Sequence, residues 1–318
     1  MKITVIGPGR WGSCIAWYLG TIGHDVTLYG QKGTDSIEEF LHTRKNSFLT
    51  LPENVAVTDS MDCIPLAETI VISIPTQALQ GLFDELKPLN LKNKNFVLCM
   101  KGIEIGTNRR LSQIAEDNLD KSNTVSVWIG PGHVQEFTKG NPSCMVIDSK
   151  NDETKHYLAD NFSSDLIRFY YGTDLIGNEI GAASKNVIGI AAGMLDGLGL
   201  SSLKGPLMAR APREIALLIK ALGGNEISAY GLCHLGDYEA TVFSEHSHNR
   251  KFGEDIVKGV KFDKLAEGYY TVIPLLTLAK QHGIDLPICS SVYEVLYNNC
   301  DAKVALLKLF SRDRKKEF

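Results

Sequence analysis

The chain has 318 residues, of which 44% are hydrophobic and 22% charged, a balance typical of a globular protein with a buried core. The formal net charge of −4 argues against nucleic acid or an anionic membrane as a partner. No apolar run approaches the ~20 residues of a membrane-spanning helix. The seven cysteines form no C-x-x-C pair, which indicates reduced thiols and a cytoplasmic location. Because M-K-I-T-V-I-G already resembles a strand, we expect no signal peptide.

The first ~170 residues alternate short apolar or β-branched runs with longer helical patterns. Such alternation predicts a Rossmann-like, doubly wound parallel sheet. The helices predicted between strands include Trp11–Ile22, Gln77–Lys87 and Arg109–Asn118. The predicted strands are Lys2–Gly7, Asp25–Gly30, Val55–Thr58, Thr69–Ile74, Asn95–Met100, Thr124–Ile129, Cys144–Ile147 and Ile167–Tyr171.

The pattern changes after about Asp174, where strand signals become rare and helical periodicity dominates. We therefore predict a dinucleotide-binding domain over residues 1–173 and an all-helical substrate-binding and catalytic domain over residues 174–318. The apolar helical domain is compatible with a homodimer. The charged tail Arg312–Phe318 is expected to be a solvated end. The predicted helices are Ile176–Leu198, Leu207–Leu222, Phe252–Val257, Thr271–His282 and Ser290–Asn298.

The first motif is G-P-G-R-W-G at Gly7–Gly12, which fits G-x-G-x-x-G and lies between a predicted strand and a predicted helix. Gly7 would allow the tight turn, Gly9 the approach of a pyrophosphate, and Gly12 the close packing of helix and strand. The phosphates would lie at the helix N-terminus, where N–H groups and the helix dipole favour anions. Arg10 would add a positive charge there. This context predicts a dinucleotide cofactor.

The end of the second predicted strand bears on which dinucleotide binds. A carboxylate there would bind the ribose hydroxyls of NAD, but this sequence has Tyr29-Gly30-Gln31-Lys32. Gln31 and Lys32 could instead accept a 2′-phosphate. The sequence therefore favours NADP over NAD, although a solvated loop lysine is nearly as consistent with the pattern.

The second motif is a helix of small and apolar residues, Glu179–Leu195, with Lys185 in its middle and Asn186 next to it. Lysine is rarely buried without a partner, and burial lowers its pKa toward neutrality. In a dehydrogenase that reduces a ketone, an ammonium can stabilise the growing charge on oxygen and supply the proton. The alternative is a lysine whose stem is buried and whose charged end reaches water.

These residues resemble a known family, the NAD(P)-dependent glycerol-3-phosphate dehydrogenases. The stretch G-N-E-I-G-A-A-S-K-N-V-I-G-I-A-A-G-M-L-D-G-L-G, Gly177 to Gly199, is similar to the family's catalytic-lysine helix. Matching fragments occur in the family's order along nearly the whole chain. They are G-P-G-R-W-G at Gly7, I-P-T-Q at Ile74, M-K-G-I-E at Met100, I-G-P-G at Ile129, L-G-D-Y-E-A-T at Leu235, S-H-N-R-K-F-G at Ser247 and A-E-G at Ala266.

The resemblance implies roles for individual residues. Lys185 would be the general acid in reduction and the base in oxidation, and Asn186 would orient the substrate. Lys101 would contact both substrate and cofactor, while Asp237 and Thr241 would complete the polar network around Lys185. Further residues would hold the substrate's phosphate end, namely Gly130, Gly132, Ser247, His248 and Asn249. Others would line the cofactor, namely Trp11, Val134 and Glu267.

The sequence departs from the family at three positions that face anions. The family usually has arginine at His248, serine or threonine at Gly132, and a small residue at Arg10. Arg250 or Lys251 could replace the missing charge. Two substrate hypotheses follow: dihydroxyacetone phosphate, reduced to sn-glycerol 3-phosphate, or another small phosphorylated, phosphonate or carboxylate ketone or hydroxy compound. A third hypothesis, a dinucleotide-binding sensor without catalysis, is disfavoured by the presence of Lys185 and its expected partners.

Other charged residues leave alternatives open. His234, His246 and His248 lie near Asp237, but their spacing follows no ligand pattern and we expect no metal. Either Asp196 or Glu179 could pair with Lys185, or both could be surface charges. Lys204 and Arg210 are either solvated or part of an anion site. His133 is either a substrate contact or a surface histidine.

Overall fold

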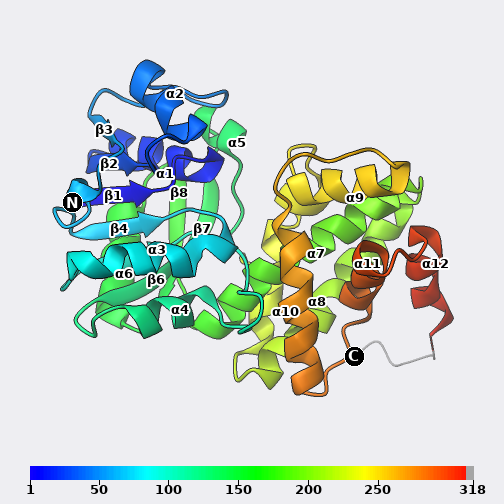
Figure 1. Ribbon diagram of the computed structural model, residues 1–318. Helices are drawn as coiled ribbons and strands as arrows, with labels where there is room; N and C mark the ends of the chain where they lie inside the picture. The colour runs from blue at the N-terminus through cyan, green and yellow to red at the C-terminus, as the bar shows by residue number, and fades with distance from the viewer. Residues whose placement is uncertain (313–318) are drawn as a thin grey trace. The chain divides into compact units, whose positions relative to one another are not determined.

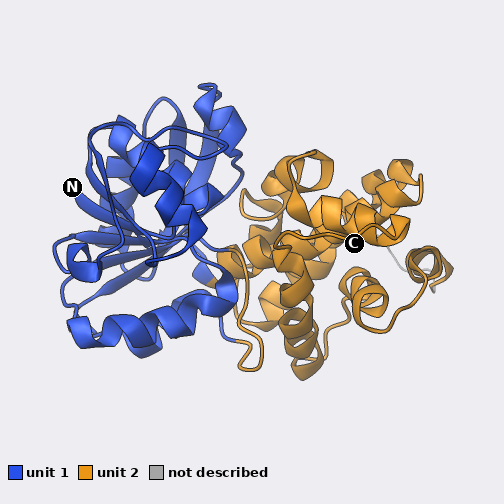
Figure 2. Ribbon diagram, turned by 45° about the horizontal axis from the view of Figure 1, so that its top comes forward, with its two compact units in different colours: residues 1–100, 109–175 blue, residues 101–108, 176–318 orange. Residues whose placement is uncertain are grey.

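The computed structural model describes residues 1–312. The chain forms two compact units, coloured separately in Figure 2: unit 1 contains Met1–Met100 and Arg109–Leu175, and unit 2 contains Lys101–Asn108 and Ile176–Phe318. The sequence predicts residues 101–108 to be part of the first domain. They belong with unit 2, because Ile103 is fully buried in the core of that unit. Of the predicted tail, residues 313–318 lie outside the described residues.

Unit 1 is built on one sheet of eight strands in the described chain, in the order β3-β2-β1-β4-β5-β6-β7-β8. All eight predicted strands are present, with ends that differ by at most two residues. Most of them are buried along their length, as expected for strands covered on both faces. They are β1 (Lys2–Ile6), β2 (Asp25–Tyr29), β3 (Val55–Thr58), β4 (Thr69–Ile72), β5 (Asn95–Leu98), β6 (Thr124–Ile129), β7 (Ser143–Ser149) and β8 (Ile167–Tyr171).

The Rossmann-like, doubly wound topology is confirmed, and the sheet is parallel except at one pair of strands. Strands β6 and β7 are antiparallel, with Ile129 opposite Val146. The segment between them contains only the five-residue helix α5 (Val134–Thr138), which does not carry the chain back along the sheet. Strand β7 therefore begins at the edge where β6 ends, and β8 runs parallel to β7.

The helices of unit 1 cover the sheet, and the order of strands reverses between β1 and β4. Such a reversal places the loops after these strands at a topological switch point, where open α/β sheets bind ligands. Tyr18 on α1 and Trp128 on β6 pack edge to face with ring centroids 6.1 Å apart. In Figure 1, α3 and α4 lie side by side on one face of the sheet. The helices are α1 (Arg10–Thr21), α2 (Asp35–Thr43), α3 (Leu79–Leu86), α4 (Leu111–Asn118) and α6 (Asp152–Phe162), with the short turns η1 (Met61–Cys63), η2 (Thr76–Ala78) and η3 (Lys87–Leu89).

Unit 2 is helical. Its five predicted helices are all present, but α9 and α10 each begin four residues before the predicted start. At α9, Ser247 caps the helix by accepting a hydrogen bond from the Arg250 amide. The α-helices are α7 (Leu175–Gly197), α8 (Lys204–Ala221), α9 (His248–Lys258), α10 (Glu267–Gln281), α11 (Pro287–Tyr297) and α12 (Ala302–Leu307). The shorter turns are η4 (Ser201–Leu203), η5 (Glu226–Tyr230), η6 (Leu235–Asp237), the π-helical η7 (Glu239–Phe243) and η8 (Lys308–Ser311).

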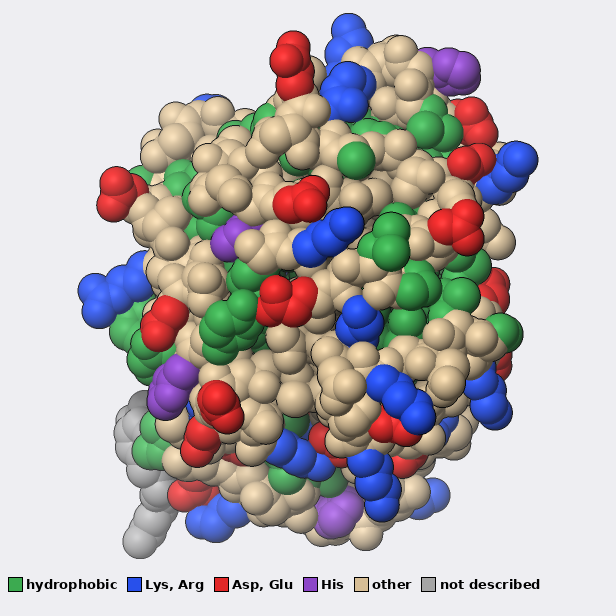
Figure 3. Space-filling model, turned by 90° about the vertical axis from the view of Figure 1, so that its left-hand side faces the viewer, with side chains coloured by type: hydrophobic (Ala, Val, Ile, Leu, Met, Phe, Trp, Pro, Cys, Tyr) green, Lys and Arg blue, Asp and Glu red, His purple; other side chains and the backbone are tan. Residues whose placement is uncertain are grey.

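Positively and negatively charged side chains are mixed on the surface. Figure 3 shows Lys and Arg side chains interspersed with Asp and Glu on one face of the molecule, in keeping with the small net charge. Within residues 1–312, no helix is both long and apolar enough to span a membrane.

Helices α7 and α9 approach each other closely through glycine. A Cβ atom on Gly193 of α7 would lie 1.8 Å from the carbonyl oxygen of Arg250, and one on Gly253 of α9 would lie 2.1 Å from that of Ile190. Each helix thus places a glycine against the other's backbone, where no side chain fits. This contact explains why glycines recur on the part of α7 that meets α9.

We expect Gly193→Ala to lower the free energy of unfolding by roughly 1–3 kcal/mol, the usual cost of overpacking, because the new methyl group would overlap a backbone oxygen. Urea unfolding followed by circular dichroism measures the change. Gly205→Ala on α8 is the matched control, since its Cβ would meet nothing within 4 Å. Equal stability of the Gly193→Ala variant and the parent protein would contradict the close approach.

Candidate active site

The loop between β1 and α1 has the geometry of a dinucleotide-binding turn. Gly7 has a φ of +107°, which favours glycine, and a Cβ on Gly12 would lie only 1.9 Å from the Gly7 carbonyl oxygen. At the start of α1, Gly9 provides no side-chain cap, and a Cβ there would meet nothing within 4 Å. Open space therefore adjoins the N-terminus of α1. These features fit a pyrophosphate bound at that helix end.

Arg10 and Trp11 link this loop to α5. The Arg10 guanidinium donates to Gln135 Oε1 at 2.8 Å and lies 5.1 Å above the Phe48 ring. Burial lowers the pKa of Arg10. The indole nitrogen of Trp11 is buried, and no described residue accepts its hydrogen bond. Trp11 also packs against Phe137, so both side chains contact α5.

Gly132 departs from the family pattern for a reason of packing. A Cβ at this position would lie 2.9 Å from atoms of both the Trp11 and the Phe137 rings. These two rings pack with centroids 6.1 Å apart and occupy the space that a side chain would need. The other predicted residues of unit 1 lie at the same edge of the sheet or next to it. Gly130 follows β6 with a φ of +123°, Val134 begins α5 and is buried, and Gln31 is exposed after β2.

Unit 2 brings two lysines onto one buried carboxylate. The ammonium groups of Lys185 and Lys101 each lie 2.7 Å from Asp237 Oδ2. The Asp237 side chain is 1% exposed and that of Lys185 is 9% exposed. The second oxygen, Asp237 Oδ1, is buried and has no hydrogen-bond partner among residues 1–312. It remains available as an acceptor for a donor that is not part of the chain.

Thr241 completes the surroundings of Lys185. The Lys185 ammonium donates to Thr241 Oγ1 at 2.9 Å. Thr241 lies in the π-helical turn η7, which is separated by one residue from the short turn η6 that contains Asp237. Single π-turns occur frequently at functional sites. The structure thus gathers Lys185, Lys101, Asp237 and Thr241 into one cluster.

A chain of amide hydrogen bonds runs beside this cluster. Asn186 donates to the carbonyl oxygen of Lys101 at 2.9 Å and accepts from Asn249 at 3.1 Å. The Asn249 side-chain oxygen in turn accepts from the Gly268 backbone amide at 2.9 Å. This chain connects α7, α9 and α10. The sequence alone does not predict these hydrogen bonds, because residues so distant in sequence carry no local signal of their pairing.

The environment of Lys185 suits proton transfer. Burial lowers the pKa of Lys185 from 10.5 to about 8; the Asp237 carboxylate opposes this change and the nearby charge of Lys101 adds to it. At a pKa near 8, both the ammonium and the neutral amine are well populated close to neutral pH. A group of this kind can act as a general acid in one direction and as a base in the other.

The nearby histidines have different surroundings. His234 donates from Nδ1 to the Gly181 carbonyl and accepts at Nε2 from the Tyr238 hydroxyl, and burial lowers its pKa to about 4. It is therefore a neutral core histidine. His248, the first residue of α9, donates from Nδ1 to the Leu265 carbonyl at 3.3 Å. Among residues 1–312, no group of three or more His, Cys, Asp or Glu side chains is arranged to hold a metal ion.

The sequence left open whether Asp196 or Glu179 pairs with Lys185. The surroundings of both side chains differ from those of Asp237. Asp196 pairs with Lys204 and Arg250 and not with Lys185. Arg250 is thereby engaged within unit 2, as is Lys251, which pairs with Asp255. Glu179 is buried on α7, and Glu267 is the first residue of α10.

Comparison with known proteins identifies the family. Residues 2–155 match the family model described as the N-terminus of NAD-dependent glycerol-3-phosphate dehydrogenase, and residues 174–307 match the model of its C-terminus. The chain belongs to the NAD-dependent glycerol-3-phosphate dehydrogenase family. The family resemblance predicted from the sequence fragments is therefore confirmed.

Individual relatives match over their whole length. A glycerol-3-phosphate dehydrogenase (NAD(P)+) of Prosthecochloris aestuarii is 34% identical over 332 residues, which cover 100% of both chains. One of Fusobacterium nucleatum is 35% identical and covers 100% of this chain and 98% of its own. The crystal structure of glycerol-3-phosphate dehydrogenase from Coxiella burnetii superimposes with a TM-score of 0.92 at 26% identity, covering 98% of this chain and 99% of that one.

The pKa of Lys185 can be measured in this family member by NMR of protein labelled with [13C]lysine, with Lys185→Arg for assignment. We expect a titration near pH 8. Asp237→Asn should lower this pKa, because it removes a carboxylate that stabilises the charged form of Lys185. Lys101→Met should raise it, because it removes a neighbouring positive charge. A pKa near the ordinary 10.5, or one that Asp237→Asn leaves unchanged, would contradict the described electrostatics.

Proposed function

We propose that the protein interconverts dihydroxyacetone phosphate and sn-glycerol 3-phosphate with NAD(P), and that Lys185 is the general acid and base. The observation that carries the proposal is the buried Lys185 ammonium, held by Asp237 and Thr241 with a pKa near 8. The full-length match to enzymes of this name supports this substrate over the alternative ketones. The same match, with the complete lysine cluster, also disfavours a catalytically silent sensor.

The cofactor would be held mainly by the loop at the start of α1. Gly7, Gly9 and Gly12 would admit the pyrophosphate to the N-terminus of α1, with Arg10 adjacent. When bound, the nicotinamide supplies or accepts the hydride at the substrate's C2. The relatives are named as enzymes that use NAD or NADP. In this chain, the exposed side chains of Gln31 and Lys32 favour the 2′-phosphate of NADP. Trp11 and Val134 on unit 1, and Lys101 and Glu267 on unit 2, are the further proposed cofactor contacts.

Lys185 would move the proton that accompanies the hydride. As hydride adds to the carbonyl carbon, negative charge develops on oxygen, and the Lys185 ammonium donates its proton there. In the reverse direction the neutral amine takes the proton from the hydroxyl group. Asp237 holds the ammonium through Oδ2, while its buried Oδ1 can accept a hydrogen bond from a substrate hydroxyl. The amide chain through Asn186 fixes the Lys101 backbone beside this centre.

Within unit 2, the residues at the start of α9 would hold the phosphate of the substrate; the roles of Gly130 and Gly132 stay predictions from the family resemblance. α9 begins at His248, and Ser247 and Asn249 flank this position. The helix N-terminus favours an anion, and since His248 Nδ1 donates to the Leu265 carbonyl, the ring could donate to the phosphate from Nε2 only in its protonated form. We also infer a reducing, cytoplasmic compartment from the seven free cysteines. A homodimer remains a prediction.

Turnover of dihydroxyacetone phosphate with NADPH and NADH, followed by the loss of absorbance of the reduced cofactor, tests the proposal. Lys185→Met should lower kcat by about 10²- to 10⁴-fold, the contribution typical of general acid–base catalysis. The Kd of the reduced cofactor should stay within about twofold, since the side chain acts on the substrate's oxygen. Lys220→Met is the control, because Lys220 forms an exposed ion pair with Glu226. Turnover retained by Lys185→Met would refute the role of Lys185.

A further inference from the structure

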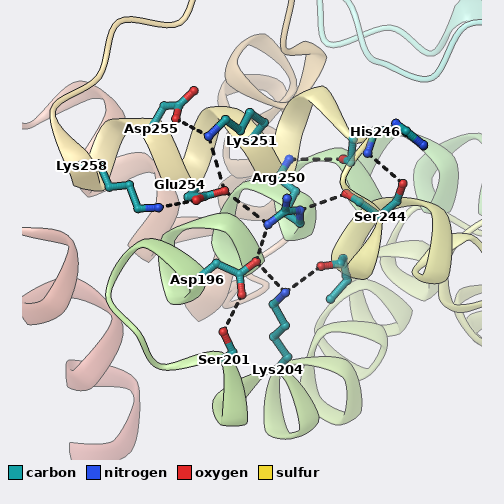
Figure 4. Close-up of polar contacts among 12 residues, drawn as sticks. Asp196, Ser201, Lys204, Ser244, His246, Arg250, Lys251, Glu254, Asp255 and Lys258 are labelled. Atoms are coloured by element: carbon teal, nitrogen blue, oxygen red, sulfur yellow. Dashed lines mark hydrogen bonds and ion pairs between the residues drawn. The ribbon is translucent and has the colours of Figure 1, made fainter.

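The carboxylate of Asp196, near the end of α7, joins two cations from different helices (Figure 4). Lys204 of α8 lies 2.6 Å from Asp196 Oδ2, and Arg250 of α9 lies 2.7 Å from the same oxygen. Ser201 donates to the other oxygen, Oδ1, at 2.7 Å. The three charged side chains are only 10–14% exposed. They are therefore shielded from the solvent screening that makes exposed ion pairs weak.

Both cations also reach the backbone of the segment that carries Thr241. Lys204 Nζ donates to the Val242 carbonyl at 3.0 Å, and Arg250 Nε donates to the Ser244 carbonyl at 3.0 Å. The Lys204 ammonium also lies 5.4 Å from the centre of the Phe243 ring. Phe243 is the residue between Val242 and Ser244. The cations thus hold the carboxyl end of the π-helical turn η7 at two points.

A π-helical turn needs such support. Its hydrogen bonds differ from those of an α-helix, and single π-turns are an uncommon geometry that the surroundings must favour. Thr241, whose hydroxyl accepts from Lys185, is adjacent to Val242. Lys185 and Asp196 both lie on α7, about three helical turns apart. One helix therefore provides both the ammonium that contacts Thr241 and the carboxylate that anchors the segment carrying Thr241.

We propose that Asp196 is a positioning residue for catalysis: through Lys204 and Arg250 it holds the η7 turn so that Thr241 stays within hydrogen-bond distance of Lys185. This inference deepens the proposed dehydrogenase function and rests on it. Asp196 does not contact the proposed reacting atoms itself. Its effect reaches Lys185 through the backbone of Val242 and Ser244.

Asp196 must carry a negative charge to hold Lys204 and Arg250 side by side. Burial alone would raise its pKa, but hydrogen bonds from Lys204, Ser201 and Arg250 hold the pKa below the ordinary value, so the group is ionised at neutral pH. Replacing it with a neutral amide would leave two shielded cations side by side, and each would move away from the other. Such movement would loosen the contacts with Val242 and Ser244.

Glu254 offers a matched control within the same network. Its carboxylate contacts Arg250 at 3.4 Å, and its other partners, Lys251 and Lys258, lie like Arg250 on α9 itself. None of the hydrogen bonds that hold Val242 and Ser244 involves Glu254. Glu254→Gln therefore removes one charge from the cluster without releasing η7.

The kinetic test compares Asp196→Asn and Glu254→Gln in the full chain. Asp196→Asn should lower kcat by roughly tenfold or more, since small misplacements near a reacting group cost up to about a hundredfold, while the KM for cofactor stays within about twofold. Glu254→Gln should retain the parent kcat. In a Thr241→Val background, Asp196→Asn should change kcat by less than about twofold, because its effect passes through Thr241. An equal fall of kcat in both backgrounds would overturn the inference.

A second measurement does not depend on activity. Hydrogen–deuterium exchange of the backbone amides from Tyr238 to Ser244 should become severalfold faster in Asp196→Asn and stay unchanged in Glu254→Gln. Unchanged exchange in Asp196→Asn would overturn the inference whatever the kinetics show. If the parent protein does not turn over dihydroxyacetone phosphate with either cofactor, the proposed function fails. The exchange comparison then decides by itself whether Asp196 holds η7.

Discussion

Removing the ammonium of Lys185 from water costs several kcal/mol unless other groups compensate, and much of unit 2 serves that compensation. Asp237 supplies the opposite charge and Thr241 an acceptor, while the glycines of α7 let α9 approach closely enough for Asn249 to bond with Asn186. The close packing of α7 against α9 and the contacts around Lys185 therefore both serve to bury this ammonium. A bulkier α7 would separate the two asparagines.

The charges along α7 form two centres with different tasks. Around Lys185, one carboxylate is shared by two lysines, so burial prevails and the pKa of Lys185 falls to about 8. Around Asp196, one carboxylate is shared by a lysine and an arginine that also bind backbone carbonyls. The first centre can exchange a proton near neutral pH. The second holds its charges fixed and supports the segment that the first centre uses.

Much of this could be predicted from the sequence, because the informative patterns are local. Continuous apolar runs located the eight strands, and G-P-G-R-W-G in its strand–helix context located the dinucleotide turn. Contacts between distant segments could not be read in this way. The placement of Lys101 in the helical unit depends on Ile103 packing into that core, and the antiparallel β7 depends on the path of α5. The glycine at 132 is explained only by two rings that fill its space.

Chemical rescue tests the central claim most directly. In Lys185→Ala, small primary amines added to the assay should restore turnover of dihydroxyacetone phosphate in a concentration-dependent way, and rates for different amines should follow their pKa values, as general acid catalysis requires. Alcohols of the same size should not restore it. If the variant still binds the reduced cofactor but no amine restores turnover, the proton does not come from the amine at position 185, and the account of this site is wrong.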